Sequence, residues 1–434
     1  MARKLLVLTL FLLLLPTAAQ EVEPFSLIEL QEFAETFSPN LAQQRLAYSN
    51  LVESVTIAKT KYDPVFQLRR GWQETDDPER TTGNINQTLP ADLNLRLTAR
   101  NETRNEEDIT NLAVNLSKTI LGGGSFLESR LPIERAWIRE AREANRLSLD
   151  QRNLRLTVAQ RYYSVVRNIL TLRLRKLQLE RAKQNLEHAI AKEDPLDIAT
   201  AELRIPESEL DVLRVERFIE SSTLELAETI GYPVDQPLTA STNLVYEVRP
   251  FALEKDLTFA LSNHESILNS QLTLKLNRLE AKAARRKNLP EVRVEASYEE
   301  SDGGGEDTSE TRAELVVEWP WLDRRDRAET RQRQNDVKNA EIGVFETEQT
   351  IRKNIATTAA QLLEAEQAVE LERQRVKALE RQLVLYQDRW ENGEINILEY
   401  VRSQNDFENA KVQLVSQQAR YMELRAEYDF LIGR

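Results

Sequence analysis

Few residues of this chain have the types and spacing that a chemical site requires. The two histidines, His188 and His264, lie far apart on predicted helices, so neither a zinc pair nor a histidine-based general acid or base is indicated. We interpret both as solvated helix residues. The glycine runs at 122–124 and 303–305 lack the Lys-Ser/Thr that completes a phosphate loop, and turns explain them better. The sequence has no cysteine. We therefore expect no enzyme, no cofactor and no metal site.

Residues 1–19 have the pattern of a secretory signal peptide, with Arg3 and Lys4 before an apolar run. A membrane anchor is the alternative, but the run is too short for a bilayer, which needs about 20 residues. Removing two cations and no acids takes the net charge from −13 to −13 − 2 = −15. This acidity argues against nucleic acid as a partner. Since no later run could span as a helix, we expect a soluble exported protein or a closed β-barrel.

The C-terminal part predicts two long helices, at about 327–391 and 398–432. Apolar residues recur every seven positions in the first of them, which is typical of a helix packed in a coiled coil. They are Ile355, Leu362, Val369, Val376, Leu383 and Trp390. A helix of about 65 residues rises roughly 100 Å, so the protein should be elongated. Between the helices, Gly393 can take the left-handed conformation that ends one helix, and Asn396 can cap the next.

The order of predicted elements occurs twice, which indicates a tandem duplication. Helices at 27–62 and 253–287 each precede strands and two further helices. Pro64 matches Pro290 at an offset of 290 − 64 = 226, and Leu196 matches Leu398 at 398 − 196 = 202. After the signal peptide we therefore expect a first repeat at 20–250 and a second at 251–434. The difference of 24 residues places an insertion around 75–110 of the first repeat, either a strand pair or a long surface loop.

The predicted strands are too few to close a barrel within one chain. Two clear strands in each half give four per chain, so a trimer would supply twelve and could close an outer-membrane barrel. The fold class is therefore mainly α with a small β part, combining long helical hairpins with antiparallel strands of a shared transmembrane barrel. Four aromatic residues near strand ends would form a membrane-interface girdle, although core packing is an alternative. They are Trp72, Tyr298, Trp319 and Trp321.

Three motifs then make the sequence resemble a known family. They are Asp63-Pro64, Leu289-Pro290 and the stretch from Trp390 to Glu399. Together with the duplication and the signal peptide, they resemble the TolC-like outer-membrane efflux protein family. The resemblance implies a homotrimer in outer-membrane lipid, with a helical tunnel through the periplasm. It also implies a passive exit duct for efflux or type I secretion, docked through a periplasmic adaptor on an inner-membrane pump. The alternatives are a periplasmic coiled-coil adaptor and an envelope structural protein.

The resemblance also implies which residues act at the two helical tips. The adaptor would contact the first tip at Asp194 and Pro195, and the second tip at Gly393, Glu394, Ile395 and Asn396. The first tip lacks the family's glycine. Acids that follow the tips face the narrowed tunnel mouth in this family, and here Asp197 and Glu399 match those positions. We hypothesise an acidic ring that favours cations, with helix-dipole stabilisation as the alternative reading. Arg402 replaces a second acid, which would alter the gate.

Overall fold

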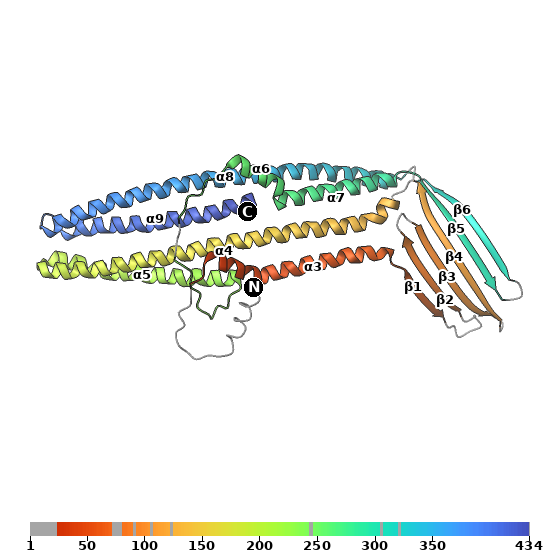
Figure 1. The fold of residues 1–434 in the computed structure, drawn as a ribbon, viewed down its shortest axis with the longest axis horizontal. Helices are drawn as coiled ribbons and strands as arrows, with labels where there is room; N and C mark the ends of the chain where they lie inside the picture. Colours follow the sequence, from red (N-terminus) through yellow and green to blue (C-terminus); the bar gives the residue numbers. More distant parts are fainter. Residues whose placement is uncertain are drawn as a thin grey trace.

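The protein is a long helical bundle with a β-sheet at one end (Figure 1). The computed structural model describes residues 24–71, 80–89, 93–104, 107–121, 125–242, 246–303, 307–319 and 323–433. The expected signal peptide at 1–19 lies outside these ranges. None of the described helices combines the length and the apolar character that crossing a bilayer requires.

The described elements follow one order twice: two helices, strands, a very long helix and a shorter one. The first series is α2 (Leu27–Phe37), α3 (Pro39–Lys59), a 3-10 turn (Thr60–Tyr62), β1 (Val65–Gly71), β2 (Arg80–Leu89), β3 (Leu93–Arg104), β4 (Glu107–Leu121), α4 (Ser125–Lys192) and α5 (Pro195–Ile230). The second series is α6 (Leu253–Asn263), α7 (Glu265–Lys287), β5 (Glu291–Asp302), β6 (Thr308–Glu318), α8 (Arg324–Glu391) and α9 (Ile397–Ile432). Each very long helix has 68 residues, which corresponds to a rise of about 100 Å.

The first helix of each series is interrupted, although the sequence predicted continuous helices at 27–62 and 253–287. Ser38 separates α2 from α3, and His264 separates α6 from α7. The two breaks are related by 264 − 38 = 226 positions, the offset that also relates Pro64 to Pro290. Pro39 starts α3, a position where its missing N–H costs no hydrogen bond. No proline marks the second break, and a histidine cap is a weak signal.

His264 is therefore not the solvated helix residue that the sequence predicted. It is 5% exposed, and its Nδ1 accepts a hydrogen bond from the backbone N–H of Ser266 at 3.2 Å. Burial lowers the pKa of His264, the nearby Arg152 lowers it further, and Glu265 opposes them. Both the cap and the low pKa favour the neutral imidazole.

This environment predicts a pH-dependent loss of stability. The unfolded state binds the proton first, because its pKa is near the ordinary value of about 6.5. The stabilisation should be complete above that pH and should be lost as the pH falls toward the lower folded pKa. The loss should be about 1 kcal/mol, the typical value of a helix cap. Thermal unfolding of the purified protein between pH 8 and pH 5 measures it. His264→Asn keeps a capping side chain and should flatten the profile, whereas an equal slope in both proteins would contradict this account.

The two helical hairpins, α4 with α5 and α8 with α9, lie side by side (Figure 1). Within the C-terminal hairpin, the heptad residues Ile355, Leu362 and Val369 are at most 1% exposed, and they pack with Tyr421 and Tyr428. The hydroxyl of Tyr428 donates to the buried carboxylate of Asp256 at 3.0 Å, which ties α9 to α6. A corresponding cluster joins α2, α4 and α5. The core is therefore a series of apolar seams along the bundle.

The strands form one antiparallel sheet in the order β1-β2-β3-β4-β5-β6. The chain thus has six strands among its described residues, two more than the four clear strands that the sequence predicted. The additional pair is β2 and β3, so the insertion of the first half is a hairpin of strands rather than a surface loop. The strands pair in an unbroken register except for an irregularity between Thr119 and Leu121. β1 and β6 are the two edges of the sheet.

Candidate functional site

The first helical tip is a tight turn from α4 into α5. The carboxylate of Asp194 accepts hydrogen bonds from the backbone N–H groups of Leu196 and Asp197, at 2.9 and 3.5 Å. Pro195 occupies the first turn of α5, where its fixed φ suits the helix. The residue before the cap, Glu193, has a φ of +59°. A non-glycine residue thus takes the left-handed conformation, which explains how this tip turns without the glycine that the family pattern has.

The second tip contains three more residues than the first and has a glycine at the turn. Gly393 has a φ of +73° and lies in open space, so the backbone conformation rather than crowding favours glycine here. Asn396 caps α9 by accepting a hydrogen bond from the backbone N–H of Glu399 at 3.0 Å. Glu394 pairs with Arg389 at 3.2 Å, and Ile395 is half-buried. Both tips lie at the end of the molecule opposite the sheet (Figure 1).

A small aromatic cluster holds the two tips together. Trp390 is 4% exposed, and its ring stacks on Tyr400 with centroids 4.9 Å apart and planes 3° apart. Lys192 from the other hairpin lies 4.0 Å above the Trp390 ring, and its ammonium donates to the Trp390 carbonyl at 2.7 Å. Ala189 and Ala201 pack into the same cluster. We call these five residues the tip cluster.

The two acids of the hypothesised ring lie in equivalent first turns but in different surroundings. Asp197 at the start of α5 is 8% exposed, whereas Glu399 at the start of α9 is exposed. One turn farther along α9, Arg402 is also exposed. Within one chain the structure does not join the two acids by a shared contact. A ring of acids therefore depends on how chains assemble.

A polar interface joins the two hairpins behind the tips. Asn185 on α4 donates to Gln404 on α9 at 2.8 Å, and this pair is buried. One turn away, Arg181 forms an ion pair with Glu408, which is only 2% exposed. The next pair is Gln178 with Asn405, at 3.1 Å. We call these six residues the polar ladder. The sequence analysis missed them, although Gln178 and Asn185 lie seven positions apart, each directly before a leucine (Leu179 and Leu186), where coiled coils place polar contacts.

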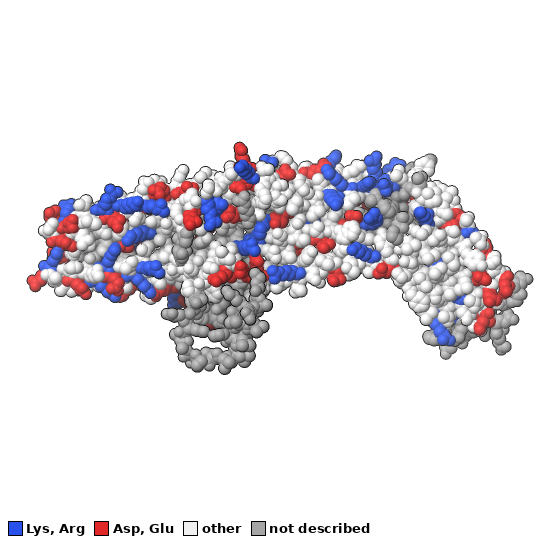
Figure 2. Space-filling model, in the orientation of Figure 1, with Lys and Arg blue, Asp and Glu red and all other residues white. Residues whose placement is uncertain are grey.

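The sheet has one apolar face and one polar face. The apolar face carries Phe66, Leu68, Ile85, Leu112, Val114, Leu116, Tyr298, Leu315 and Val317, each between 39% and 67% exposed. The polar face carries Gln67, Arg69, Asn84, Arg96, Thr98, Arg100, Asn115, Ser117, Glu295, Ser297, Glu299, Glu310, Arg312 and Glu314. Charged side chains spread along the helices, while the sheet face in view is mostly uncharged (Figure 2). Exposed apolar surface of this extent marks a site of contact with lipid or with another protein surface.

Two of the four girdle aromatics are among the described residues. Trp319 directly follows β6 and is 62% exposed. Tyr298 is not at a strand end, because it lies four residues inside β5, on the apolar face. Its hydroxyl donates to Glu300, toward the end of the sheet away from the helices. Trp72 and Trp321 lie outside the described residues.

The sequence of the second half matches a known family. A sequence model described as "Outer membrane efflux protein" matches residues 257–434. This part of the chain is therefore similar to that family in sequence. The match begins inside α6 and covers the α8–α9 hairpin with its Trp390 to Glu399 tip. Comparison with curated protein sequences gives no significant match.

The whole chain shares the fold of solved outer-membrane channels. The open-state MtrE channel of Neisseria gonorrhoeae has a TM-score of 0.72 at 16% identity, over 94% of this chain and 88% of that one. VceC of Vibrio cholerae has a TM-score of 0.71 at 14% identity, over 94% and 96%. CmeC of Campylobacter jejuni has a TM-score of 0.70 at 13% identity, over 96% and 90%. The first half of the chain, which the family model leaves unmatched, therefore shares the fold of these channels as well.

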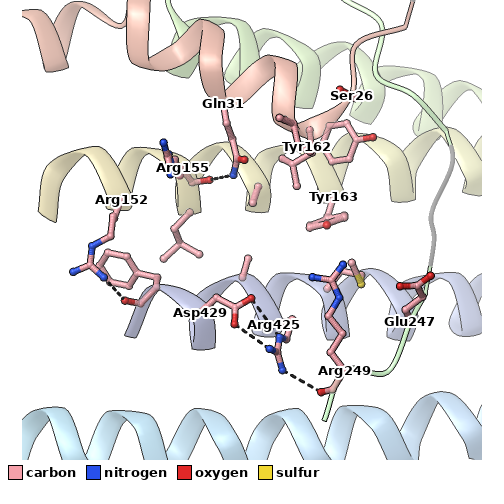
Figure 3. A pocket seen from close by; sticks show the side chains of 17 residues that line it. Ser26, Gln31, Arg152, Arg155, Tyr162, Tyr163, Glu247, Arg249, Arg425 and Asp429 are labelled. Atoms are coloured by element: carbon pink, nitrogen blue, oxygen red, sulfur yellow. Dashed lines mark hydrogen bonds and ion pairs between the residues drawn. The ribbon is translucent and has the colours of Figure 1, made fainter. Parts of the chain in front are cut away.

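A cavity of about 600 Å³ lies between α2, α4 and α9 (Figure 3). Tyr162 and Tyr163 of α4 line it, and burial together with the neighbouring Tyr162 raises the pKa of Tyr163 to about 12. Arg425 pairs with Asp429 at 3.1 Å, while Arg152 pairs with Glu265 outside the lining. Arg155, which also lines the cavity, pairs with Glu35, so three of the four arginines in the lining form ion pairs. Among the described residues, no group of three or more acids and histidines is placed to hold a metal.

Proposed function

We propose that this chain is the exit duct of a tripartite efflux or type I secretion machine. In this role it is a passive conduit from the periplasm to the exterior, with the sheet in the outer membrane and the helical hairpins in the periplasm. One observation carries the proposal: a sheet with an exposed apolar face stands at the end of a helical bundle about 100 Å long. The apolar face suits lipid, and the length suits a duct that crosses an aqueous compartment.

The family implies a trimer, and exposed apolar side chains on the two lateral edges of the protomer support it. On α5, Leu196, Leu203 and Leu210 recur every seven residues and are 54–71% exposed. On α8, at the opposite edge in Figure 1, Phe345 and Leu371 are more than 60% exposed. Such stripes would be buried when three copies close into a ring. Each copy would contribute two structural repeats, 20–250 and 251–434.

The leucine stripe gives a direct test of assembly. Replacing Leu203 and Leu210 by Glu should place six carboxylates in the buried seams of a trimer, and we expect mostly monomers in detergent. Light scattering after size-exclusion chromatography measures the mass. Val234→Glu with Val248→Glu is a control for added charge on exposed apolar positions, since both residues lie in the connection between α5 and α6 and not on an edge helix. A Leu203→Glu and Leu210→Glu protein that remains trimeric would show that this stripe is not an interface.

The helical tips are the proposed contact with a periplasmic adaptor, through which an inner-membrane pump would deliver cargo. Exposed polar residues at the second tip, Glu394 and Asn396, and the exposed Asp194 and Pro195 at the first, support this role. The two tips end side by side, so an adaptor would meet both. Their different turns mean that it would meet two distinct surfaces.

We also propose that Asp197 and Glu399, in three copies each, line the mouth of the tunnel. Glu399 is exposed at the very start of α9, and Arg402 lies one turn behind it, so the mouth would carry both signs of charge. Glu399→Gln with Asp197→Asn should lower the cation-to-anion permeability ratio of reconstituted trimers several-fold. Arg402→Gln is the matched control and should raise that ratio. Unchanged reversal potentials in both proteins would leave only a helix-dipole role for these acids.

The proposed function is tested by deletion and reconstitution. Loss of the gene should raise intracellular accumulation of exported compounds, and the purified protein should form ion-conducting pores in planar bilayers. A periplasmic adaptor or scaffold would leave the membrane fraction on carbonate washing and would give no conductance. An envelope structural protein would stay with the membrane but would leave accumulation unchanged. The first result would favour a periplasmic adaptor or scaffold over the duct, and the second would favour an envelope structural protein.

A further inference from the structure

The additional hairpin of β2 and β3 has the same two faces as the rest of the sheet. The register places Ile85 between Phe66 and Leu97, and Leu97 beside Val114. On the opposite face, Thr98 lies between Asn84 and Ala113. Because alternation has a period of two, one residue of slip would exchange the faces. The hairpin therefore lies in the same layer as the other strands and turns its apolar side the same way.

The six-stranded sheet is about as wide as the layer of four helices next to it. Next to the sheet, α3, α4, α7 and α8 lie side by side (Figure 1). Four helices at about 9 Å between axes span roughly 36 Å of a wall. Six strands at about 4.8 Å, tilted by about 40°, span roughly 38 Å, whereas four would span only about 25 Å. With six strands the wall of the tunnel continues into the sheet without a step.

The polar face is divided by charge between its two edges. On β1 to β3 it carries four arginines and one glutamate, which are Arg69, Arg80, Arg96, Arg100 and Glu102. On β5 and β6 it carries six glutamates and two arginines, which are Glu291, Glu295, Glu299, Glu310, Glu314, Glu318, Arg293 and Arg312. The net charges are 4 − 1 = +3 and 2 − 6 = −4. The neutral Asn115 and Ser117 of β4 lie between them.

The two open edges are therefore complementary in direction and in charge. In a sheet of six antiparallel strands, β1 and β6 run in opposite directions, so β6 of one copy can pair antiparallel with β1 of the next. Such pairing brings the acidic sector of one copy beside the basic sector of its neighbour. It also satisfies the unpaired backbone groups of both edges, which a membrane requires.

We propose that each copy places all six strands in the wall of the exit barrel, so that the trimer closes an eighteen-stranded barrel at three β6–β1 seams. This inference rests on the proposed function, because the trimer and the membrane location come from it. The occupant of each edge is a second copy of this chain. Eighteen strands give a backbone diameter of roughly 36 Å, compared with about 24 Å for twelve. The exit is then no narrower than the tunnel behind it, and three basic and three acidic stripes alternate around its inner wall.

The absence of cysteine from the sequence allows a sharp test. Single cysteines at Leu97 and Thr98 of β3 report on the additional hairpin, and those at Val114 and Ala113 are matched controls, because they pair with Leu97 and Thr98 in the register. In trimers in lipid vesicles, a membrane-impermeant maleimide should modify Thr98→Cys and Ala113→Cys at least tenfold faster than Leu97→Cys and Val114→Cys. All four proteins should insert, since each change is small.

The outcomes separate this inference from the proposed function. If Ala113→Cys and Val114→Cys differ but Leu97→Cys and Thr98→Cys react alike, the hairpin lies outside the wall and the inference is wrong, while the duct survives. If neither pair shows a difference, the sheet is not in lipid and both fail.

Electron cryo-microscopy of the full trimer gives an independent count. We expect eighteen strands in the complete protein. Deleting residues 72–106 and joining β1 to β4 by a two-residue Asn-Gly turn should leave twelve strands and a barrel about one third narrower. Twelve strands in the complete protein would overturn the proposal, whether or not the deletion variant folds.

Discussion

Arg181→Met should be strongly destabilising. The change leaves Glu408, which is 2% exposed, without its cationic partner in the interface between the two hairpins. Breaking a buried pair in this way costs about 3 kcal/mol, because one charge stays buried and uncompensated. Burial lowers the pKa of Lys411 and the nearby Arg181 lowers it further, so removal of Arg181 relieves a repulsion and places the loss at the lower end of the usual range. The thermal midpoint of the purified protein measures the change.

Two matched variants distinguish a buried ion pair from simple loss of a side chain. Arg217→Met removes an arginine from an exposed pair on α5, where the guanidinium is 84% exposed, and should leave the thermal midpoint unchanged. The double variant Arg181→Met with Glu408→Met replaces the pair by apolar side chains and should recover most of the stability. A double variant as unstable as the single one would mean that the lost energy came from packing and not from charge.

The polar ladder also bears on how the tips separate. Behind the tip cluster, which itself joins the two hairpins, Asn185, Gln404 and the Arg181–Glu408 pair form polar contacts between α4 and α9. Hydrogen-bonded pairs can exchange their partners for water, but apolar seams cannot. Opening of the proposed tunnel mouth between the hairpins would have to separate the tip cluster as well as the polar ladder, and the doubly apolar variant should resist it.

The sequence predicted the features that periodicity and capping determine. The seven-residue spacing predicted the α8 seam at Ile355 and Leu362, and Gly393 with Asn396 predicted the second tip. Both signals are local, since they depend on one helix face or one turn. The break at His264 was missed because a histidine cap has no distinctive local pattern. The additional strands were left open because β2 is rich in Thr and Asn, and only pairing with β3 shows its alternation.

The candidate site residues also divide into those that local signals predict and those that depend on long-range packing. The cap at Asn396 follows from residue type and position, and the structure places it at the start of α9 as predicted. Asp194 was assigned only to the first tip, and the structure shows that it also caps α5. The different burial of Asp197 and Glu399 could not be predicted, because it depends on how two hairpins pack. The polar ladder joins residues more than 200 positions apart, as in Asn185 with Gln404. Contacts of that separation leave no trace in a single sequence.

Trp390→Ala should have the largest effect of any single change at the tips. Trp390 is 4% exposed and contacts residues of both hairpins, stacking on Tyr400 and lying under the ammonium of Lys192. Removing a buried indole costs about 3–5 kcal/mol through lost burial and the cavity left behind. The loss should be local, because the tip cluster is far from the cores around Tyr428 and Leu226. Limited trypsin digestion should therefore cut at Lys192 and Arg389 at least tenfold faster, while the membrane part stays intact.

Trp137→Ala is the control for this experiment. That indole also lies beside a lysine, with Lys59 at 5.6 Å from its centroid, but it is 40% exposed and belongs to the opposite end of α4. Its loss should leave cleavage at the tips unchanged. Trp390→Phe keeps a ring for Tyr400 to stack on and should give an intermediate rate. Equal cleavage of Trp390→Ala and the unmodified protein would mean that the helix caps alone hold the tips, and then Asp194→Ala and Asn396→Ala should release them instead.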